Sequence, residues 1–158
     1  DERPALDAFF PKLPADVAVA VEFRQRGWFT EDVLARLADH GVTPALSDGP
    51  WVPRRWLLAL AERWAAGPPA PFAYVRWMGP NRDLVDHSRV QVDRAVEHRL
   101  WADALRTMTG GASGVREAFG YTSNYWAGHA PESARELQRL VGQRPVEPDA
   151  LTTQLPLL

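Results

Sequence analysis

The sequence contains no cysteine, and this absence excludes several classes of chemistry. Disulfide bonds, thiolate metal sites and cysteine nucleophiles all require that residue. Lysine is nearly absent as well, because Lys12 is the only lysine among the 18 basic residues. We interpret the excess of arginine as a consequence of a GC-rich genome rather than as a functional choice.

Long apolar runs and targeting segments are also missing. The longest apolar runs, such as residues 56–61, are far shorter than the roughly 20 residues that cross a membrane. No signal or transit peptide opens the sequence, so we expect a cytoplasmic protein without a membrane partner. The net charge of −2 and the pI of about 6.1 provide no overall positive field, which argues against a nucleic-acid partner.

Motifs for metal ions and nucleotides are missing too. The sequence has no HxH or HExxH pair. Its glycine-rich run, residues 110–114, precedes a predicted strand, whereas a phosphate-binding loop would follow one. We therefore assign no metal site and leave the cofactor unknown.

What the sequence does contain is the pattern of a folded α/β domain. Hydrophobic residues make up 46% and charged residues 24% of the 158 positions, which is enough for one domain with a core. Strands are predicted at residues 17–23, 42–47, 72–77 and 115–122. We expect the first of them to be buried on both faces, as strands of a parallel sheet are.

Helices are predicted between these strands. Helical periodicity covers residues 6–13, 30–40, 53–66, 90–108 and 132–141, and Thr30 is expected to cap the second of these helices. The side chains of the fourth helix that are expected to point inward are Val92, Val96, Leu100, Trp101, Ala104 and Leu105. Alternating strands and helices indicate a parallel sheet with helices packed outside it. Four such units give either an open sheet or half of a TIM-type (βα)8 barrel. Residues 145–158, which are rich in proline and lack periodicity, are predicted to form a surface tail.

Each predicted strand ends in polar residues. Carboxyl ends of parallel strands meet at one rim, so these side chains are expected to converge there. They are Glu22 and Arg24, Ser47 and Asp48, Arg76, and Ser123 and Asn124. We assign Glu22 and Asp48 as candidate catalytic acid/base groups, and Arg24 and Arg76 as holders of an anionic ligand group. The alternative is that Glu22 forms a buried ion pair that only stabilises the rim.

Tryptophans also follow the strand ends. Trp28, Trp51, Trp77 and Trp126 occupy such positions, and we assign Trp28 and Trp77, with Ser123 and Asn124, as ligand-binding residues. Aromatic side chains beside polar groups suit sugars and nucleobases. The alternative for each tryptophan is a place in the hydrophobic core.

Several stretches together resemble one family. They are EFRQRGW, SDGPW, AYVRWMG and GYTSNYWAGHAPESARELQRLVG, in this order. The chain resembles the second half of the YecE-like proteins, which are grouped as domain of unknown function 72. Glu22, Arg24 and Trp28 match the family pattern E-x-R-x-x-x-W, and the patterns R-x-x-G and N-x-x-x-G begin at Arg76 and Asn124. The resemblance implies a prokaryotic TIM-type barrel whose fifth to eighth strands lie in residues 1–144, and it implies no established activity.

Function is predicted from the site, since the family supplies none. We expect an enzyme that acts on a small polar or anionic ligand, either sugar-like or phosphorylated. The alternative is a non-catalytic binding module, for instance for nucleic acid, with tryptophans stacking on bases. Four strand–helix units also leave open sheet edges and inward apolar side chains, with Val19, Val21, Ala45 and Phe72 as candidates. We expect the family's N-terminal half or a second copy to cover them.

Overall fold

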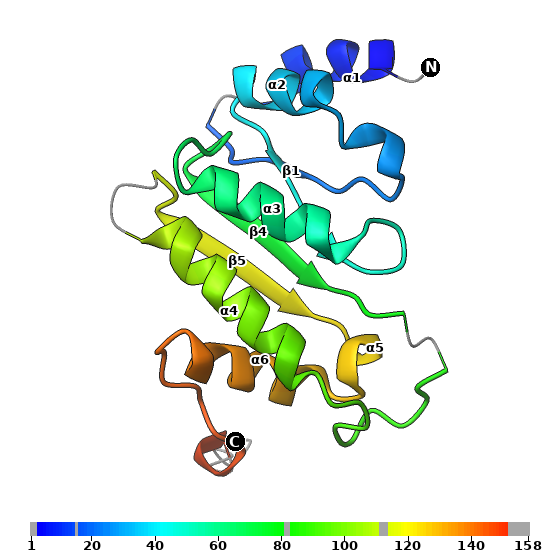
Figure 1. Cartoon of the computed structure of the whole chain (residues 1–158), viewed down its shortest axis with the longest axis vertical. Coiled ribbons are helices and arrows are strands. Elements are labelled where there is room, and N and C mark those ends of the chain that lie inside the picture. The colour runs from blue at the N-terminus through cyan, green and yellow to red at the C-terminus, as the bar shows by residue number, and fades with distance from the viewer. Residues whose placement is uncertain (1–2, 15, 81–82, 111–113, 152–158) are drawn as a thin grey trace, which may run out of the picture.

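The computed structural model describes residues 3–14, 16–80, 83–110 and 114–151 and has an α/β fold (Figure 1). The strands are β1 (Ala20–Val21), β2 (Thr43–Pro44), β3 (Leu46–Asp48), β4 (Phe72–Trp77) and β5 (Glu117–Thr122). The α-helices are α1 (Arg3–Phe9), α2 (Glu31–Asp39), α3 (Arg54–Trp64), α4 (Ala95–Thr109), α5 (Asn124–Ala127) and α6 (Ala130–Leu140). The 3-10 helices are η1 (Phe10–Lys12), η2 (Arg26–Trp28) and η3 (Pro148–Leu151).

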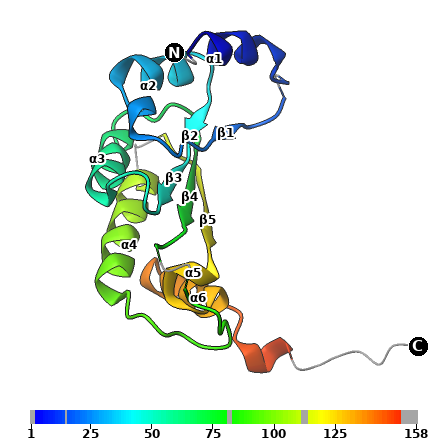
Figure 2. The same ribbon diagram turned by 90° about the vertical axis from the view of Figure 1, so that its right-hand side faces the viewer.

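All strand pairs are parallel, as the alternation of strands and helices predicts. β1 pairs with β2, while β3, β4 and β5 form a second sheet in that order. The single strand predicted at residues 42–47 is therefore two short strands that belong to different sheets and are separated by Ala45. Helices α3 and α4 cover one face of β3, β4 and β5, and no helix of the described chain covers the middle of the opposite face (Figure 2).

Helix α2 forms as its sequence predicts. The Thr30 hydroxyl accepts a hydrogen bond from the Val33 amide at 3.4 Å, and Glu31 and Asp32 lie in the first turn, where the helix dipole favours negative charge. Gly41 follows the helix with a φ of +63°, a conformation that glycine adopts without strain. The capping residue, the acidic first turn and the glycine after the helix thus all predict the same bounds for α2.

Helix α4 begins later than its periodicity predicts. The expected start near residue 90 is wrong, because the helix begins at Ala95; the amides of Gln91 and Val92 before it donate to the Ala127 carbonyl. The Asp93 carboxylate then accepts a hydrogen bond from the Ala95 amide at 2.8 Å, where the helix starts. Tertiary hydrogen bonds thus tie the segment before the helix to the end of α5.

The buried face of α4 also differs from the expectation. Val92 precedes the helix, and Val96 and Leu100, which were expected to point inward, are 62% and 44% exposed. Trp101 and Ala104 are buried as expected. His98 is buried with them, so the inward stripe passes through a polar residue.

The hydrophobic side chains form two clusters. The larger one joins β3 and β4 to α3, α4 and α6, and the smaller one joins α1 and α2 to the segment around β1. Phe29 and Leu34 pack against both clusters. The N-terminal quarter of the chain therefore has a core of its own.

The expectation for the first strand is wrong in one respect. Residues 17–23 are not buried on both faces, because Val17 is 55% exposed and the strand itself is only Ala20–Val21. Val19 and Val21 pack against the smaller cluster. Side chains alternate along an extended segment, so Ala18 and Ala20 point the other way.

The segment after α6 is described only in part. Arg139 forms an ion pair with Glu147 at 2.7 Å, which ties the start of the predicted tail to α6. Residues 152–158 of that tail lie outside the described residues. Within the part of the chain that the structure describes, no helix is long and apolar enough to cross a membrane.

Candidate functional site

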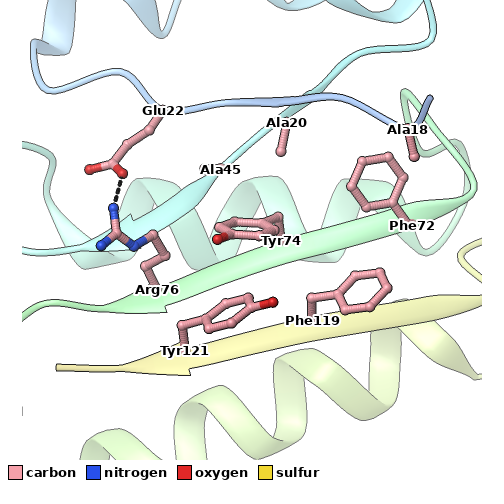
Figure 3. A pocket seen from close by; sticks show the side chains of 9 residues that line it. All are labelled: Ala18, Ala20, Glu22, Ala45, Phe72, Tyr74, Arg76, Phe119 and Tyr121. Carbon is pink, nitrogen blue, oxygen red and sulfur yellow. Dashed lines mark hydrogen bonds and ion pairs between the residues drawn. The ribbon is translucent and has the colours of Figure 1, made fainter.

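A pocket of about 470 Å³ lies on the sheet face that the helices leave uncovered, which we call the open face (Figure 3). One side of it, the aromatic half, consists of Phe72 and Tyr74 on β4 and Phe119 and Tyr121 on β5. The other side, the small half, consists of Ala18, Ala20 and Ala45. The pocket thus has large side chains on two strands and small ones facing them.

A group of three charges stands at the carboxyl-end rim of this pocket. Arg76, at the end of β4, donates through Nη1 to Oε2 of Glu22, and Arg24 donates through Nε to Oε1 of the same carboxylate at 3.1 Å. Figure 3 shows Glu22 and Arg76 facing each other across the pocket. One carboxylate therefore holds guanidinium groups from two segments that are far apart in sequence.

The alternation of side chains along β4 places Arg76 on the open face. Phe72, Tyr74 and Arg76 line the pocket, whereas Ala73, Val75 and Trp77 pack into the larger core. Arg24 is more exposed and lies over the Trp51 ring, with its guanidinium carbon 4.9 Å from the ring centre. Two guanidinium groups share one carboxylate, so the group carries one uncompensated positive charge.

Ser47 adds a polar group beside this cluster. It is paired with Arg76 in the β3–β4 register, so the two side chains lie on the same face of the sheet. The Ser47 hydroxyl is buried and has no hydrogen-bond partner among the described residues. A buried hydroxyl without a partner is costly, so Ser47 is suited to bind a ligand atom.

Asp48, expected at the same site, lies on the opposite face of the sheet. Its register partner is Trp77, which points into the helix-covered core. The Asp48 carboxylate accepts hydrogen bonds from Nε of Arg54 and, at 2.7 Å, from Nε1 of the buried Trp101. The structure therefore brings Glu22, Arg24 and Arg76 together and leaves Asp48 out.

A second polar cluster extends from Asp48 along α4. Glu97 lies 3.6 Å from Arg54 and 3.0 Å from Arg94. Partial burial acts to raise the pKa of Glu97, but hydrogen bonds from its own backbone amide and from Arg94, with the charges of both arginines, together lower it. We interpret this cluster as an ion-pair network between α3 and α4.

The same network encloses Trp126 and His98, neither of which the sequence pattern assigns to a polar cluster. Arg54 and Arg94 lie over the Trp126 ring, 5.5 Å and 4.8 Å from its centre. Its indole Nε1 donates to Nε2 of His98 at 2.8 Å, and Nδ1 of His98 is 2.9 Å from a Glu136 oxygen. The sequence around His98 does not indicate that this histidine is buried, because its partner Trp126 lies 28 residues further along the chain.

The tryptophans assigned to ligand binding are not at the pocket. Trp28 stacks on Phe23 with ring centres 5.0 Å apart and packs in the smaller cluster. Trp77 is 3% exposed and contacts Trp101 edge-on within the larger core. The core alternative is the better description of both.

Ser123 and Asn124 act as helix caps in the structure. The Ser123 hydroxyl accepts a hydrogen bond from the Tyr125 amide at 3.2 Å at the start of α5. The Asn124 side-chain oxygen accepts one from the Ala130 amide at 2.8 Å, where α6 begins. Neither residue lines the pocket with Glu22 and Arg76.

Metal ligands do not gather at this rim. Within residues 3–14, 16–80, 83–110 and 114–151, no three histidine or carboxylate side chains are grouped in a way that could hold a metal ion. The groups that could hold a ligand on the open face are therefore Glu22, Arg24, Arg76 and Ser47.

Comparisons with known proteins give a family and a fold. The model of a family described as protein of unknown function DUF72 matches residues 1–156, which confirms the resemblance seen in the sequence motifs. A solved DUF72 family protein from Enterococcus faecalis V583 is similar with a TM-score of 0.64 at 17% identity, over 89% of this chain and 54% of that one. Another, from Thermotoga maritima MSB8, is similar with a TM-score of 0.64 at 19% identity, over 89% of this chain and 51% of that one.

The chain thus spans about half the length of the solved structures that it matches. No curated protein matches the sequence.

Proposed function

We propose that this chain, which belongs to the DUF72 family of proteins of unknown function, is an enzyme of the cytoplasm. Its ligand is small and polar or anionic, and is either sugar-like or phosphorylated. The ligand binds at the carboxyl-end rim of the parallel strands. One observation carries the proposal: Glu22 on the open face binds both Arg24 and Arg76 and leaves one positive charge uncompensated.

The proposal includes a finer description of the fold. Half of the eight strands of a TIM-type barrel are present in this chain: β1, β2 continued by β3, β4, and β5. In such a barrel the open face is the interior, and the rim that carries Glu22 and Arg76 is the one at which substrates bind. The coverage of about half of each solved relative supports this description.

The side chains at the rim have distinct proposed roles. Arg76 and Arg24 hold an anionic group of the ligand, because guanidinium groups bind phosphate and carboxylate with paired hydrogen bonds. Glu22 transfers a proton to or from the ligand once one of its arginines has turned to the anion. Asp48, which had been expected to share this role, is assigned a structural one, because Arg54 and Trp101 hold its carboxylate on the helix side.

The alternative of a nucleic-acid module loses its main support. Base stacking needs aromatic faces that are open to the ligand. Trp77, the last residue of β4, and Trp126, beyond the end of β5, are 3% and 0% exposed, so these two tryptophans are closed to a base. We retain the small ligand as the proposed partner, because the exposed aromatic side chains of the open face, Phe119 and Tyr121, belong to a pocket of about 470 Å³, which suits a small molecule.

The first test measures binding. Sugar phosphates and the same sugars without phosphate are titrated against the protein by calorimetry, with Arg76→Met as the test variant. Arg63→Met is the matched control, because it removes the same charge from an exposed place. Arg63, on α3, forms an ion pair with Glu31, on α2, at 2.7 Å. We expect phosphate-dependent binding that Arg76→Met weakens at least tenfold and Arg63→Met does not. Equal binding to all three proteins would contradict the proposal.

The second test separates catalysis from binding. NMR spectra of a bound sugar phosphate are followed over time with the wild type and with Glu22→Gln, which keeps the shape of the side chain and removes its proton affinity. We expect turnover only in the wild type, while both proteins bind. Binding without turnover in the wild type would contradict the proposed catalysis and would show a binding protein instead of an enzyme.

A further inference from the structure

We infer that Trp51 is a positioning residue of the ligand site, and that it holds the guanidinium group of Arg24 at the rim with its terminal nitrogens toward the anionic group of the ligand. The inference rests on the proposed function, because it assigns Arg24 to that ligand. Four features of the structure support it: the place of the Trp51 ring, the hydrogen bond to the Trp51 carbonyl, the space beside Gly49, and the hydrogen bonding of Arg24.

The Trp51 ring lies under the guanidinium group of Arg24. The guanidinium carbon is 4.9 Å from the ring centre, within the roughly 6 Å over which an aromatic face attracts a cation, and tryptophan gives the strongest attraction of this kind. The side chain of Arg24 is 56% exposed, so little else restricts its rotamers. A long side chain that is already fixed loses less conformational entropy when a ligand binds. The ring therefore favours binding by fixing Arg24 beforehand.

A second arginine holds the backbone of Trp51. Arg26 donates through Nε to the Trp51 carbonyl at 3.3 Å, and the two residues are 25 positions apart in sequence. Arg24 and Arg26 lie between β1 and α2, whereas Trp51 lies between β3 and α3. One segment thus contacts both the ring and the backbone of the same tryptophan. The two contacts fix the turn that carries Trp51 against the segment that carries Arg24.

Gly49 leaves the space in which the Trp51 ring lies. A Cβ atom at this position would be 2.8 Å from Cζ3 and 3.0 Å from Cε3 of the ring, whereas carbon atoms pack best about 3.5–4.0 Å apart. The φ angle of Gly49 is not positive, so the position requires glycine for space and not for its backbone conformation. Trp51 also packs against the larger cluster, which anchors the ring from the core side.

The hydrogen bonding of Arg24 leaves one end of its guanidinium group to a ligand. Nε donates to Glu22 at 3.1 Å, and Nη1 and Nη2 have no partner among the residues that the structure describes. The terminal N–H groups of a guanidinium point in nearly parallel directions, which matches two oxygens of a phosphate or carboxylate. Glu22 thus fixes Arg24 at Nε and Trp51 fixes it at one face, so that only the terminal nitrogens remain for the ligand.

A double-mutant cycle tests the inference. Calorimetry measures the affinity for glucose 6-phosphate of the wild type, Trp51→Leu, Arg24→Met and the variant with both changes. We expect Trp51→Leu to weaken binding about two- to fivefold, the factor that corresponds to one cation–π contact at an exposed site. In the Arg24→Met background the same change should cause no further loss. Equal losses in the two backgrounds would overturn the inference, because Trp51 would then act without Arg24.

Three further variants accompany the cycle. Trp51→Phe keeps an aromatic face under Arg24 and should retain most of the affinity. Trp56→Leu is the matched control, because it removes a tryptophan that is 42% exposed on α3, and it should bind as the wild type does. Gly49→Ala keeps Trp51 but displaces its ring, so it should weaken binding and remains decisive if Trp51→Leu does not fold. Wild-type affinity in Gly49→Ala would overturn the inference.

A measurement without ligand separates this inference from the proposed function. Nitrogen NMR relaxation of the Arg24 Nε–H group gives an order parameter, which reports how firmly the side chain is held. We expect it to fall in Trp51→Leu and in Gly49→Ala and to stay unchanged in Trp56→Leu. An unchanged value in the first two variants would overturn the inference even if glucose 6-phosphate binds. A lowered value, with no binding of glucose 6-phosphate to the wild type, would confirm that Trp51 positions Arg24 and contradict the proposed ligand.

Discussion

The surroundings of Glu22 and Asp48 differ although their places in the sequence are alike. Each carboxylate stands at the carboxyl end of a parallel strand segment, and each binds an arginine. Glu22 faces the open side of the sheet, where its partners Arg24 and Arg76 border a pocket. Asp48 faces the helices, with 5% of its side chain exposed and the Trp101 indole as its second donor.

The comparison shows what the rim of a sheet does and does not determine. Position along the strand brings both carboxylates to one rim, but the alternation of side chains sends them to opposite faces. The carboxylate on the open face can meet a ligand, while the one on the helix side ties α3 and α4 to the sheet. Four predictions test this division, beginning with the largest expected effect.

Asp48→Ala should cost the most stability. The substitution leaves the Trp101 indole N–H without its acceptor in the core and Arg54 with only Glu97, so we expect the free energy of unfolding to fall by about 3 kcal/mol. Urea unfolding followed by circular dichroism measures it. Asp48→Asn is the matched control, since it keeps an oxygen for the indole and should cost less than half as much. A loss below about 1 kcal/mol for Asp48→Ala would remove the distinction between the two carboxylates.

Arg76→Met should affect binding more than folding. Arg24 still binds Glu22 in this variant, and methionine suits the neighbouring aromatic side chains, so we expect less than about 1 kcal/mol of lost stability. A tenfold loss of affinity for an anionic ligand corresponds to about 1.4 kcal/mol. Thermal unfolding and calorimetry on the same preparation give both values. A melting temperature lower by several degrees, with affinity intact, would show that the Glu22–Arg76 pair is structural.

Asn124→Ala should act through a helix terminus alone. The substitution removes the hydrogen bond to the Ala130 amide at the start of α6, and loss of a cap costs about 1 kcal/mol. Affinity for an anionic ligand should remain that of the wild type. A loss of affinity at unchanged stability would return Asn124 to the ligand site.

Acidification should change stability the least of the four tests, and the group responsible, Glu132 on α6, does not line the pocket. Hydrogen bonds from Arg135, and next from Arg139, lower the pKa of Glu132 on α6. A lowered pKa means that its contribution to stability is fully present above the ordinary glutamate value of about 4.3 and is lost as the pH falls through the lowered one. Melting temperatures between pH 5 and pH 2.5 should therefore fall slightly more for the wild type than for Glu132→Gln. Parallel curves would contradict the assignment.

The sequence predicted the fold where local signals agree. The strand at Phe72–Trp77 has the predicted bounds, and Thr30 caps α2 as expected. The later start of α4 goes with a tertiary contact, in which the Ala127 carbonyl accepts hydrogen bonds from the amides of Gln91 and Val92. A contact between segments so far apart in sequence leaves no trace in local periodicity.

The site was predicted in part for a related reason. The pattern identified Glu22, Arg24 and Arg76, and the structure brings these three together. The sequence pattern could not decide which of Ser47 and Asp48 points to the open face, since a shift of one residue exchanges the two faces of a strand. Nor could it separate aromatic side chains that line a pocket from tryptophans that fill a core.

The division of the core into two clusters, joined through Phe29 and Leu34, has a consequence for the unfolding of the molecule. The β1–β2 ladder is only two residues long, and the N-terminal segment is otherwise linked to the rest of the described chain through the backbone at Ala45, the packing of Phe29 and Leu34, and ion pairs such as Glu22–Arg76 and Glu31–Arg63. A segment that has a core of its own and shares only a short strand ladder with the main sheet opens as a separate cooperative unit. Backbone amides of α2 should therefore exchange with deuterated solvent faster than those of β4, and the N-terminal quarter should be exposed to a protease before the main sheet is.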